Sequence, residues 1–300
     1  MVKVSIRVPA TSANMGPGFD SFGCALSLYN IYTFEIIEKG LEITGCPEEF
    51  CNADNLSIVA YRDTMTAMGL PMDALRMSIH TEIPVCRGLG SSSAMLAAGA
   101  MAANVLHGSP LSKEELLKIC TRVEGHPDNL APAIFGGMTA SLMRGDTPIM
   151  ARFPLSEKLR FTALVPDFHL STELARSILP KEIPFADAVF NISHAALLLR
   201  ALETADVGMI SFALNDRLHQ PYRKGLIPGY DTAQQVAKTC GAASFCISGA
   251  GPTCLCISDS EEVSRKLEMA IPKVLPNWQV LSLTLDTVGC CVVEEEAIPN

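Results

Sequence analysis

The stretch CRGLGSSSAM, residues 86–95, constrains the fold most, because two glycines, three serines and an apolar run follow one another there. Gly88 and Gly90 can adopt a positive φ and let the backbone approach a ligand. The alanine- and methionine-rich run behind them favours a helix over about residues 92–106, and free N–H groups at a helix start attract anions. The stretch predicts either a phosphate site or a turn in which serines cap a buried helix.

A phosphate site here needs an unusual source of positive charge. No lysine lies between Arg87 and Lys113, so the common loop G-x-x-x-x-G-K-[ST] is absent. Main-chain amides and the helix dipole can supply part of the positive potential. Mg²⁺ held by a serine of residues 91–93 and a carboxylate can supply the rest.

Composition narrows the class of protein. The chain has 300 residues, 48% of them hydrophobic, and a net charge of −9, which argues against nucleic-acid binding. Its eleven cysteines include no C-x-x-C pair, so we expect reduced thiols, most of them buried. The first residues alternate like a strand and do not resemble a signal peptide. The longest apolar run, 94–103, is too short to span a bilayer, and we expect a cytoplasmic protein.

The pattern of polar and apolar residues predicts an α+β protein. Ser112 and Glu115 form a capping-box signal, and Gly125 ends the helix that they begin. A turn-rich loop is expected at 10–23, and the weakest seam between two parts of the chain lies at 145–160, with a ligand groove between the parts. Strands are predicted at 2–9, 32–37, 41–44, 74–84, 137–143, 161–165, 243–249, 253–258 and 278–285, and further helices at 55–68, 171–178, 185–203, 206–215, 229–240 and 260–271.

Three ordered motifs resemble the GHMP small-molecule kinases. PVCRGLGSSSA (84–94) resembles their ATP-binding signature, RVPATSANMGPGFDSFG (7–23) their amino-terminal motif, and CISGAGPTCLCI (246–257) their carboxy-terminal glycine motif. EGHPDNLAPAIFGG (124–137), STELARSILP and LHQPYRKGLIPG are similar to stretches of the homoserine kinase family within that superfamily. The resemblance covers most of the chain.

The resemblance implies a fold and an activity. It implies a two-domain GHMP kinase architecture, with residues 1–152 forming an ATP-binding domain like ribosomal protein S5 domain 2 and residues 153–300 a ferredoxin-like domain. It implies Mg²⁺-assisted transfer of the γ-phosphoryl group of ATP to the hydroxyl of L-homoserine, giving O-phospho-L-homoserine for threonine biosynthesis. Relatives often form homodimers, although no stretch of this sequence identifies such an interface.

The resemblance also implies roles for single residues in substrate binding. Arg176 and Arg223 would bind the carboxylate of homoserine, and Asp20 would face its ammonium group. Asn14, His126 and Asn129 would hydrogen-bond the substrate and orient it. Thr172 would lie near the transferred phosphoryl group, and Gly249 would belong to the turn that closes the site. The candidate catalytic residues are Asn14, Asn129 and Thr172. Each has a plainer alternative, such as a turn residue, a helix cap or a solvated side chain.

For the nucleotide, the resemblance implies that Ser92 and Glu124 hold Mg²⁺ and that Asn55 contacts adenine. A helix N-cap is the alternative for Asn55, and a surface glutamate at a helix end is the alternative for Glu124. The remaining ATP-binding residues implied are Pro84, Val85, Cys86, Arg87, Gly88, Leu89, Gly90, Ser91 and Ser93.

The mechanism implied has no protein base. Several relatives carry an aspartate base where this chain has Asn129, whose amide cannot accept a proton, and the side chain of the adjacent Asp128 is expected to point elsewhere. Positioning and charge neutralisation dominate phosphoryl transfer. Two other readings remain open: a GHMP kinase for a sugar or a mevalonate derivative, and a non-catalytic binding module with the same fold.

Overall fold

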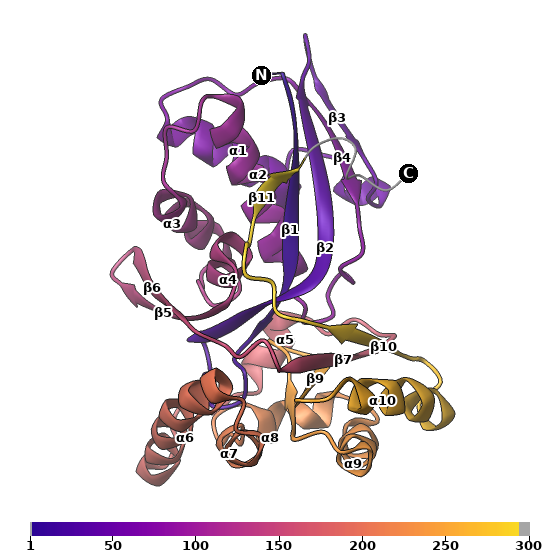
Figure 1. Ribbon diagram of the computed structural model, residues 1–300. Coiled ribbons are helices and arrows are strands. Elements are labelled where there is room, and N and C mark those ends of the chain that lie inside the picture. Colours follow the sequence, from indigo (N-terminus) through magenta and orange to yellow (C-terminus); the bar gives the residue numbers. More distant parts are fainter. Residues whose placement is uncertain (1, 294–300) are drawn as a thin grey trace.

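Two sheets lie one above the other in the computed structural model, which describes residues 2–293 (Figure 1). The first sheet has seven strands in the order β11-β1-β2-β4-β3, with β5 and β6 attached beside β2. Its strands are β1 (Lys3–Ala13), β2 (Phe22–Ile36), β3 (Leu41–Thr44), β4 (Leu75–His80), β5 (Met138–Arg144), β6 (Thr147–Phe153) and β11 (Cys291–Val293).

Four helices cover one face of the first sheet (Figure 1). They are α1 (Leu56–Ala67), α2 (Ser91–Leu106), α3 (Lys113–Glu124) and α4 (Leu130–Phe135), and a short 3₁₀ helix η1 (Glu48–Phe50) precedes α1. The predicted start of α3 is confirmed, because Ser112 and Glu115 make both hydrogen bonds of a capping box and Gly125 ends the helix in a left-handed conformation.

The second sheet is antiparallel, in the order β10-β7-β9-β8, and helices lie on its side away from the first sheet (Figure 1). Its strands are β7 (Arg160–Pro166), β8 (Ser244–Ile247), β9 (Cys254–Ser258) and β10 (Trp278–Leu283). The helices of this half are α5 (Thr172–Ser177), α6 (Phe185–Thr204), α7 (Val207–Ala213), α8 (Gln220–Arg223), the 3₁₀ helix η2 (Lys224–Leu226), α9 (Tyr230–Cys240) and α10 (Glu261–Val274).

The structure corrects the predicted loop and seam, and it extends the strand predicted at 32–37 back to Phe22 in β2. The loop expected at 10–23 is much shorter, because β1 continues to Ala13, which pairs with Gly23 of β2. A bulge at Pro9 and Ala10 breaks the alternation of polar and apolar residues along β1, which hides this continuation in the sequence. The seam expected at 145–160 contains β6, which forms a hairpin with β5 around Gly145. Among residues 2–293, β6 pairs only with β5, and an edge strand tolerates Pro148.

The two halves of the chain are not separate along the sequence. The chain passes from the first sheet to the second between Phe153 and Arg160, but it returns near its end. β11 pairs antiparallel with β1, and Leu285 bridges to Leu26 of β2. Residues 285–293, which the sequence-based boundary assigns to the second domain, therefore complete the first sheet.

Helix α6 is, by length and composition alone, apolar enough to cross a membrane. Its residues Leu198, Ala201 and Leu202 are buried, and it packs against α7. One such helix is weak evidence for a membrane span, because core helices of soluble proteins meet the same criteria. The eleven cysteines all lie in the described residues without a disulfide bond, and seven of them are buried.

Gly99 lets α1 and α2 approach closely. A Cβ atom built on Gly99 would lie 1.9 Å from the main-chain oxygen of Ser57, so one of the two helices would have to shift. We expect Gly99→Ala to lower the free energy of unfolding by about 3 kcal/mol, the upper range for overpacking a core, measured by urea denaturation. Gly208→Ala is the matched control, since its Cβ has no neighbour closer than 3.4 Å; equal effects of the two substitutions would contradict this account of the packing.

Candidate active site

Most of the residues singled out in the sequence line one cavity of about 200 Å³. The cavity collects the loop after β1, the glycine loop before α2, the turn before α4, the first turns of α5, the end of α8 and the turn between β8 and β9. The predicted residues that line it are Asn14, Asp20, Cys86, Gly88, Gly90, Ser91, Ser92, Glu124, His126, Asn129, Thr172, Arg176, Arg223 and Gly249.

Other predicted residues lie outside the cavity lining. Asn55 caps α1: its side chain accepts a hydrogen bond from the Ser57 amide and donates one to the Phe50 carbonyl, each 3.0 Å long. Leu89 is fully buried in the core, and Arg87 binds the Pro166 carbonyl at 2.9 Å. The lining also omits Pro84, Val85 and Ser93.

The glycine loop is held by close contacts that exclude side chains. Gly88 and Gly90 have φ values of +77° and +71°. A Cβ atom on Gly88 would lie 2.5 Å from the Ser248 carbonyl oxygen, and one on Gly90 would lie 1.9 Å from Oγ1 of Thr11. The Ser248 hydroxyl donates to the Gly88 carbonyl at 2.6 Å. The loop is therefore fixed between the two sheets.

The start of α2 faces the cavity without a side-chain cap. Its N-cap is Gly90, which has no polar side chain, and the hydroxyls of Ser92 and Ser93 donate instead to Glu124 at 2.6 and 3.1 Å. The first N–H groups of a helix have no partner within the helix. The amides of this first turn are thus available to an anion.

Glu124 and Ser92 fit a magnesium ion that is shared with a phosphate. Both carboxylate oxygens of Glu124 point to the serine hydroxyls at the start of α2. Mg²⁺ is commonly held by one or two carboxylates together with substrate phosphates. Residues 2–293 contain no cluster of three or more His, Cys, Asp or Glu that could hold a metal alone. The donor set therefore suits an ion that arrives with a nucleotide.

Besides Glu124 and Asp128, the cavity contains a group of three charged residues, Asp20, Arg176 and Arg223. Arg176 binds both carboxylate oxygens of Asp20, each at 2.9 Å. Arg223 is fully buried; its Nε donates to the Ala175 carbonyl at 3.0 Å and its Nη1 to the Gly249 carbonyl at 3.1 Å. Burial lowers the pKa of Arg223 to about 10, with Arg176 contributing, so the guanidinium stays charged at neutral pH. The site can therefore bind an anion next to a carboxylate.

Asn14 positions the loop after β1. It has a φ of +70°, and its side chain accepts a hydrogen bond from the Asp20 amide at 2.9 Å and donates one to the Gly249 carbonyl at 2.7 Å. Asp20 also has a positive φ, of +53°. Strained backbone of this kind persists only where surrounding contacts enforce it, and it is frequent at functional sites.

Asp128 corrects the sequence analysis, which expected its side chain to point elsewhere. Asp128 and Asn129 both line the cavity, because residues 126–129 form a turn before α4 in which successive side chains do not alternate. Burial, with the nearby charge of Asp20, raises the pKa of Asp128 to about 7. Asn129 accepts a hydrogen bond from the Thr11 hydroxyl at 2.8 Å.

Sequence reasoning also missed Leu170 and Ser171 as lining residues. Ser171 caps α5 by accepting a hydrogen bond from the Leu174 amide at 3.1 Å, which places Thr172 as the first residue of that helix. The pattern of a serine followed by a helical run signals the cap. Nothing in the sequence signals that Leu170 approaches the glycine loop, where its amide contacts the Cys86 carbonyl at 3.5 Å.

Comparison with known proteins gives one family along the chain. The family model for the GHMP kinases N terminal domain matches residues 55–137, and the GHMP kinases C terminal model matches residues 194–277. The homoserine kinase of Clostridium botulinum is 41% identical over 297 residues, covering 98% of this chain and 100% of the relative. That of Clostridium beijerinckii is 41% identical over 294 residues, covering 97% of this chain and 99% of the relative.

Solved structures agree with this assignment. The crystal structure of homoserine kinase from Cytophaga hutchinsonii is 28% identical, with a TM-score of 0.89 and 98% of each chain covered. The L. major mevalonate kinase in complex with R-mevalonate is 16% identical, with a TM-score of 0.76, 94% of this chain and 96% of that chain covered, and shows the fold alone.

The chain belongs to the GHMP kinases. Within that superfamily, 41% identity over nearly its full length places it in the homoserine kinase family. This confirms the predicted two-domain α+β architecture and the family resemblance of the three motifs.

Proposed function

We propose that the chain transfers the γ-phosphoryl group of ATP to the side-chain hydroxyl of L-homoserine. The observation that carries this proposal is one small cavity that combines an uncapped helix start with a buried arginine next to an Asp20–Arg176 ion pair. The helix start suits a phosphate, and the charged groups suit an amino acid with a carboxylate and an ammonium. The product is O-phospho-L-homoserine, a precursor for threonine biosynthesis.

The charged residues divide the binding of homoserine between them. Arg223, fixed by the Ala175 and Gly249 carbonyls, and Arg176 bind the carboxylate through guanidinium hydrogen bonds. Asp20 faces the ammonium group while it stays paired with Arg176. His126 and Asn129 orient the substrate, and Thr172 lies near the transferred group. Asn14 contributes by fixing Asp20 and the Gly249 turn.

The triphosphate of ATP binds at residues 86–92 and at the amides of the first turn of α2. Ser92 and Glu124 hold Mg²⁺ together with the phosphates. When bound, this ion neutralises charge on the transferred group. Asn55 stays a candidate for contact with adenine, although its side-chain amide already bonds within the α1 cap.

The transfer needs no protein base in this proposal, because phosphoryl transfer depends mainly on positioning and on charge neutralisation. Asp20 is paired with Arg176, and Glu124 accepts from two serines, so neither carboxylate is free to take the hydroxyl proton. Asp128 is the competing candidate, since it lines the cavity and its pKa is raised to about 7. A substitution separates the two mechanisms.

We expect Asp128→Asn to leave kcat within about tenfold of the unmodified chain, because general-base catalysis contributes about 10²–10⁴-fold where it operates. The measurement is kcat from pH 5.5 to 8.5. A base with a pKa near 7 must lose its proton to act, so kcat would rise through pH 7 in the unmodified chain and lose that rise in the variant. If kcat of the unmodified chain rises through pH 7, and the variant loses both this rise and several orders of magnitude in kcat, the base-independent mechanism is contradicted.

The reaction is tested by ³¹P NMR of ATP, Mg²⁺ and L-homoserine after incubation with the purified chain. The expected result is the resonance of a phosphate monoester on homoserine together with ADP. Parallel ADP-release assays with mevalonate and galactose distinguish homoserine from the substrates of other GHMP kinases. Binding of ATP and homoserine without turnover would instead identify a non-catalytic module.

We further propose a cytoplasmic enzyme that does not bind nucleic acid and forms a homodimer. The net charge of −9 supports the absence of nucleic-acid binding. A stripe of exposed apolar side chains on α6 supports the homodimer, because Phe185, Val189 and Ile192 are 85%, 49% and 71% exposed. Light scattering on the unmodified chain and on Ile192→Asp tests the dimer, which the substitution should dissociate.

A further inference from the structure

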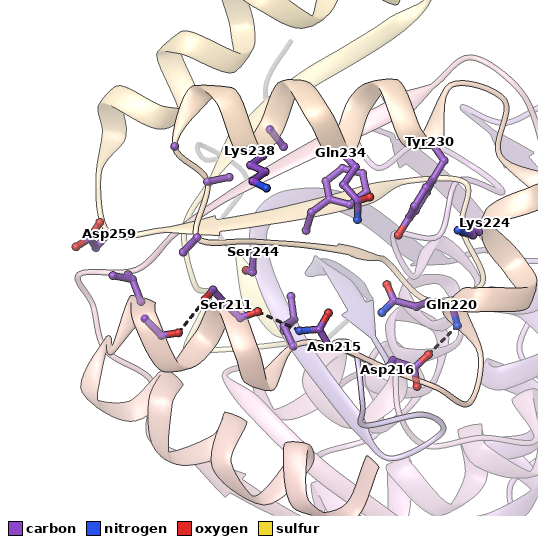
Figure 2. A pocket seen from close by; sticks show the side chains of 18 of the residues that line it. Ser211, Asn215, Asp216, Gln220, Lys224, Tyr230, Gln234, Lys238, Ser244 and Asp259 are labelled. Carbon is purple, nitrogen blue, oxygen red and sulfur yellow. Dashed lines mark hydrogen bonds between the residues drawn. The ribbon is translucent and has the colours of Figure 1, made fainter. Parts of the chain in front are cut away.

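A second cavity, of about 830 Å³, lies in the other half of the molecule from the glycine loop (Figure 2). Its walls are α7, the segment that leads into α8, the outer face of α9 and the edge strand β8. No residue to which the family resemblance or the phosphoryl transfer proposed above assigns a role lines this cavity. Its volume falls within the range of about 300–1,000 Å³ that is typical of small-molecule sites.

Two hydroxyl groups that the proposed reaction does not involve line this cavity. Ser244 is only 9% exposed, and within the described residues its buried hydroxyl oxygen has no hydrogen-bond partner. A buried hydroxyl without a partner is unfavourable, and a ligand can supply the missing hydrogen bond. Tyr230 directs its hydroxyl toward the same space in Figure 2, and burial raises its pKa, which keeps the phenol a neutral donor. These groups can donate hydrogen bonds to a ligand.

Two lysines and two aspartates line the cavity, and the lysines can bind a negatively charged ligand. Lys224 and Lys238 both line the cavity, and neither forms an ion pair with any residue in the part of the chain that is described. Asp259 lies at one end. The carboxylate of Asp216 already accepts hydrogen bonds from the amides of His219 and Gln220 at 2.9 and 2.7 Å, so it is less available to a ligand than the two lysines.

Helix α8 separates this cavity from the active site. Gln220, at its start, lines the second cavity and accepts a hydrogen bond from the Ile247 amide at 2.8 Å. Arg223, at its end, lines the active site and binds the Gly249 carbonyl at 3.1 Å. The same four-residue helix, whose first amide donates to Asp216, therefore carries a wall of one cavity and the buried arginine of the other.

We propose that the second cavity binds a small oxyanion, a carboxylate or a phosphate group, and that its occupancy is transmitted to Arg223 through α8. Lys238 with Ser244 at one side of the cavity, or Lys224 with Tyr230 at the other, supplies a positive charge and a hydrogen-bond donor for the anion (Figure 2). A ligand that moves Gln220 also moves the turn that positions Arg223. The ligand is thus an effector of homoserine binding. This role is additional to the transfer reaction, and the KM for L-homoserine reports it.

The test uses the full chain with its active site filled by a nonhydrolysable ATP analogue, Mg²⁺ and L-homoserine, so that the position of the terminal phosphate is occupied and the glycine loop cannot bind the probe. Inorganic phosphate and succinate are titrated separately by calorimetry, which distinguishes a phosphate site from a carboxylate site. We expect one of them to bind, and the double variant Lys224→Met/Lys238→Met to bind it at least about tenfold more weakly. Lys39→Met, an exposed lysine in another part of the chain, should bind as the unmodified chain does.

Two further measurements separate a ligand site from a structural cavity. Ser244→Ala should weaken binding of the probe and also raise the Tm of the unliganded chain, because it removes an unpaired hydroxyl. The saturating probe should change the KM for L-homoserine about fivefold in the unmodified chain but not in the double-lysine variant. Failure of both probes to bind, binding that the lysine substitutions leave unchanged, or an unchanged KM would overturn the proposal. A chain that lacked kinase activity could still bind the probe, so the two proposals fail separately.

Discussion

Replacing Arg223 by methionine should lower kcat/KM for L-homoserine by about a thousandfold, while the KM for ATP changes little. The guanidinium is fully buried and held by the carbonyls of Ala175 and Gly249, so it is aimed before the substrate arrives. Two hydrogen bonds to a carboxylate, each worth about 1.5–3 kcal/mol, account for a loss of this size. Steady-state kinetics with each substrate varied in turn measures it.

Arg217→Met is the matched control for this experiment. Arg217 lies six residues earlier, is half exposed and pairs with Asp187 at 3.0 Å, outside the cavity that binds homoserine. We expect its kcat/KM to stay within about twofold, since exposed ion pairs contribute little to stability or to function. Circular dichroism checks that Arg223→Met remains folded. A folded Arg223 variant that lost less than tenfold in kcat/KM would remove the carboxylate role of this residue.

Gly90→Ala should lower kcat/KM for ATP by at least about a hundredfold. The added Cβ would lie 1.9 Å from Oγ1 of Thr11, and the residue must hold a φ of +71°. Relief of this overlap moves the start of α2, and a displacement of about 1 Å can cost a factor of about a hundred in rate. Thr11 also donates to Asn129, so the same displacement reaches the side that binds homoserine.

Gly108→Ala controls for the conformational part of that effect. Gly108 also has a left-handed φ, of +85°, but a Cβ atom there would meet nothing within 4 Å. Both substitutions therefore carry the cost of a left-handed alanine, about 1–2 kcal/mol, but only Gly90→Ala changes the site. We expect Gly108→Ala to lower Tm and leave the KM for ATP unchanged. If both variants had the same kinetics, the close packing of Gly90 would have no role in nucleotide binding.

Local signals in the sequence were sufficient for several helices and strands. The capping box of Ser112 and Glu115 and the terminal Gly125 locate α3, because all three contacts lie within one helix. The glycines and serines of residues 88–93 indicate an anion site, since the exposed N–H groups of a helix start depend on its own residues. The three motifs supplied the remaining site residues through family resemblance.

Contacts between distant segments could not be predicted in this way. The continuation of β1 to Ala13 depends on pairing with β2, and β11 is a strand only because β1 offers it an edge. The position of Asp128 depends on the turn before α4, which places two successive side chains in one cavity. The fixation of Arg223 by Ala175 and Gly249 joins residues that lie 48 and 26 positions away. Local periodicity carries no information about such contacts.

The most direct measurement is a crystal structure of the chain with a nonhydrolysable ATP analogue, Mg²⁺ and L-homoserine. Main-chain amides at the start of α2, together with a divalent ion, replace the lysine of other phosphate loops in this account. It predicts the terminal phosphate within hydrogen-bond distance of the amides of residues 91–93, with the ion between it and Glu124. A triphosphate bound far from residues 88–93 would contradict the account.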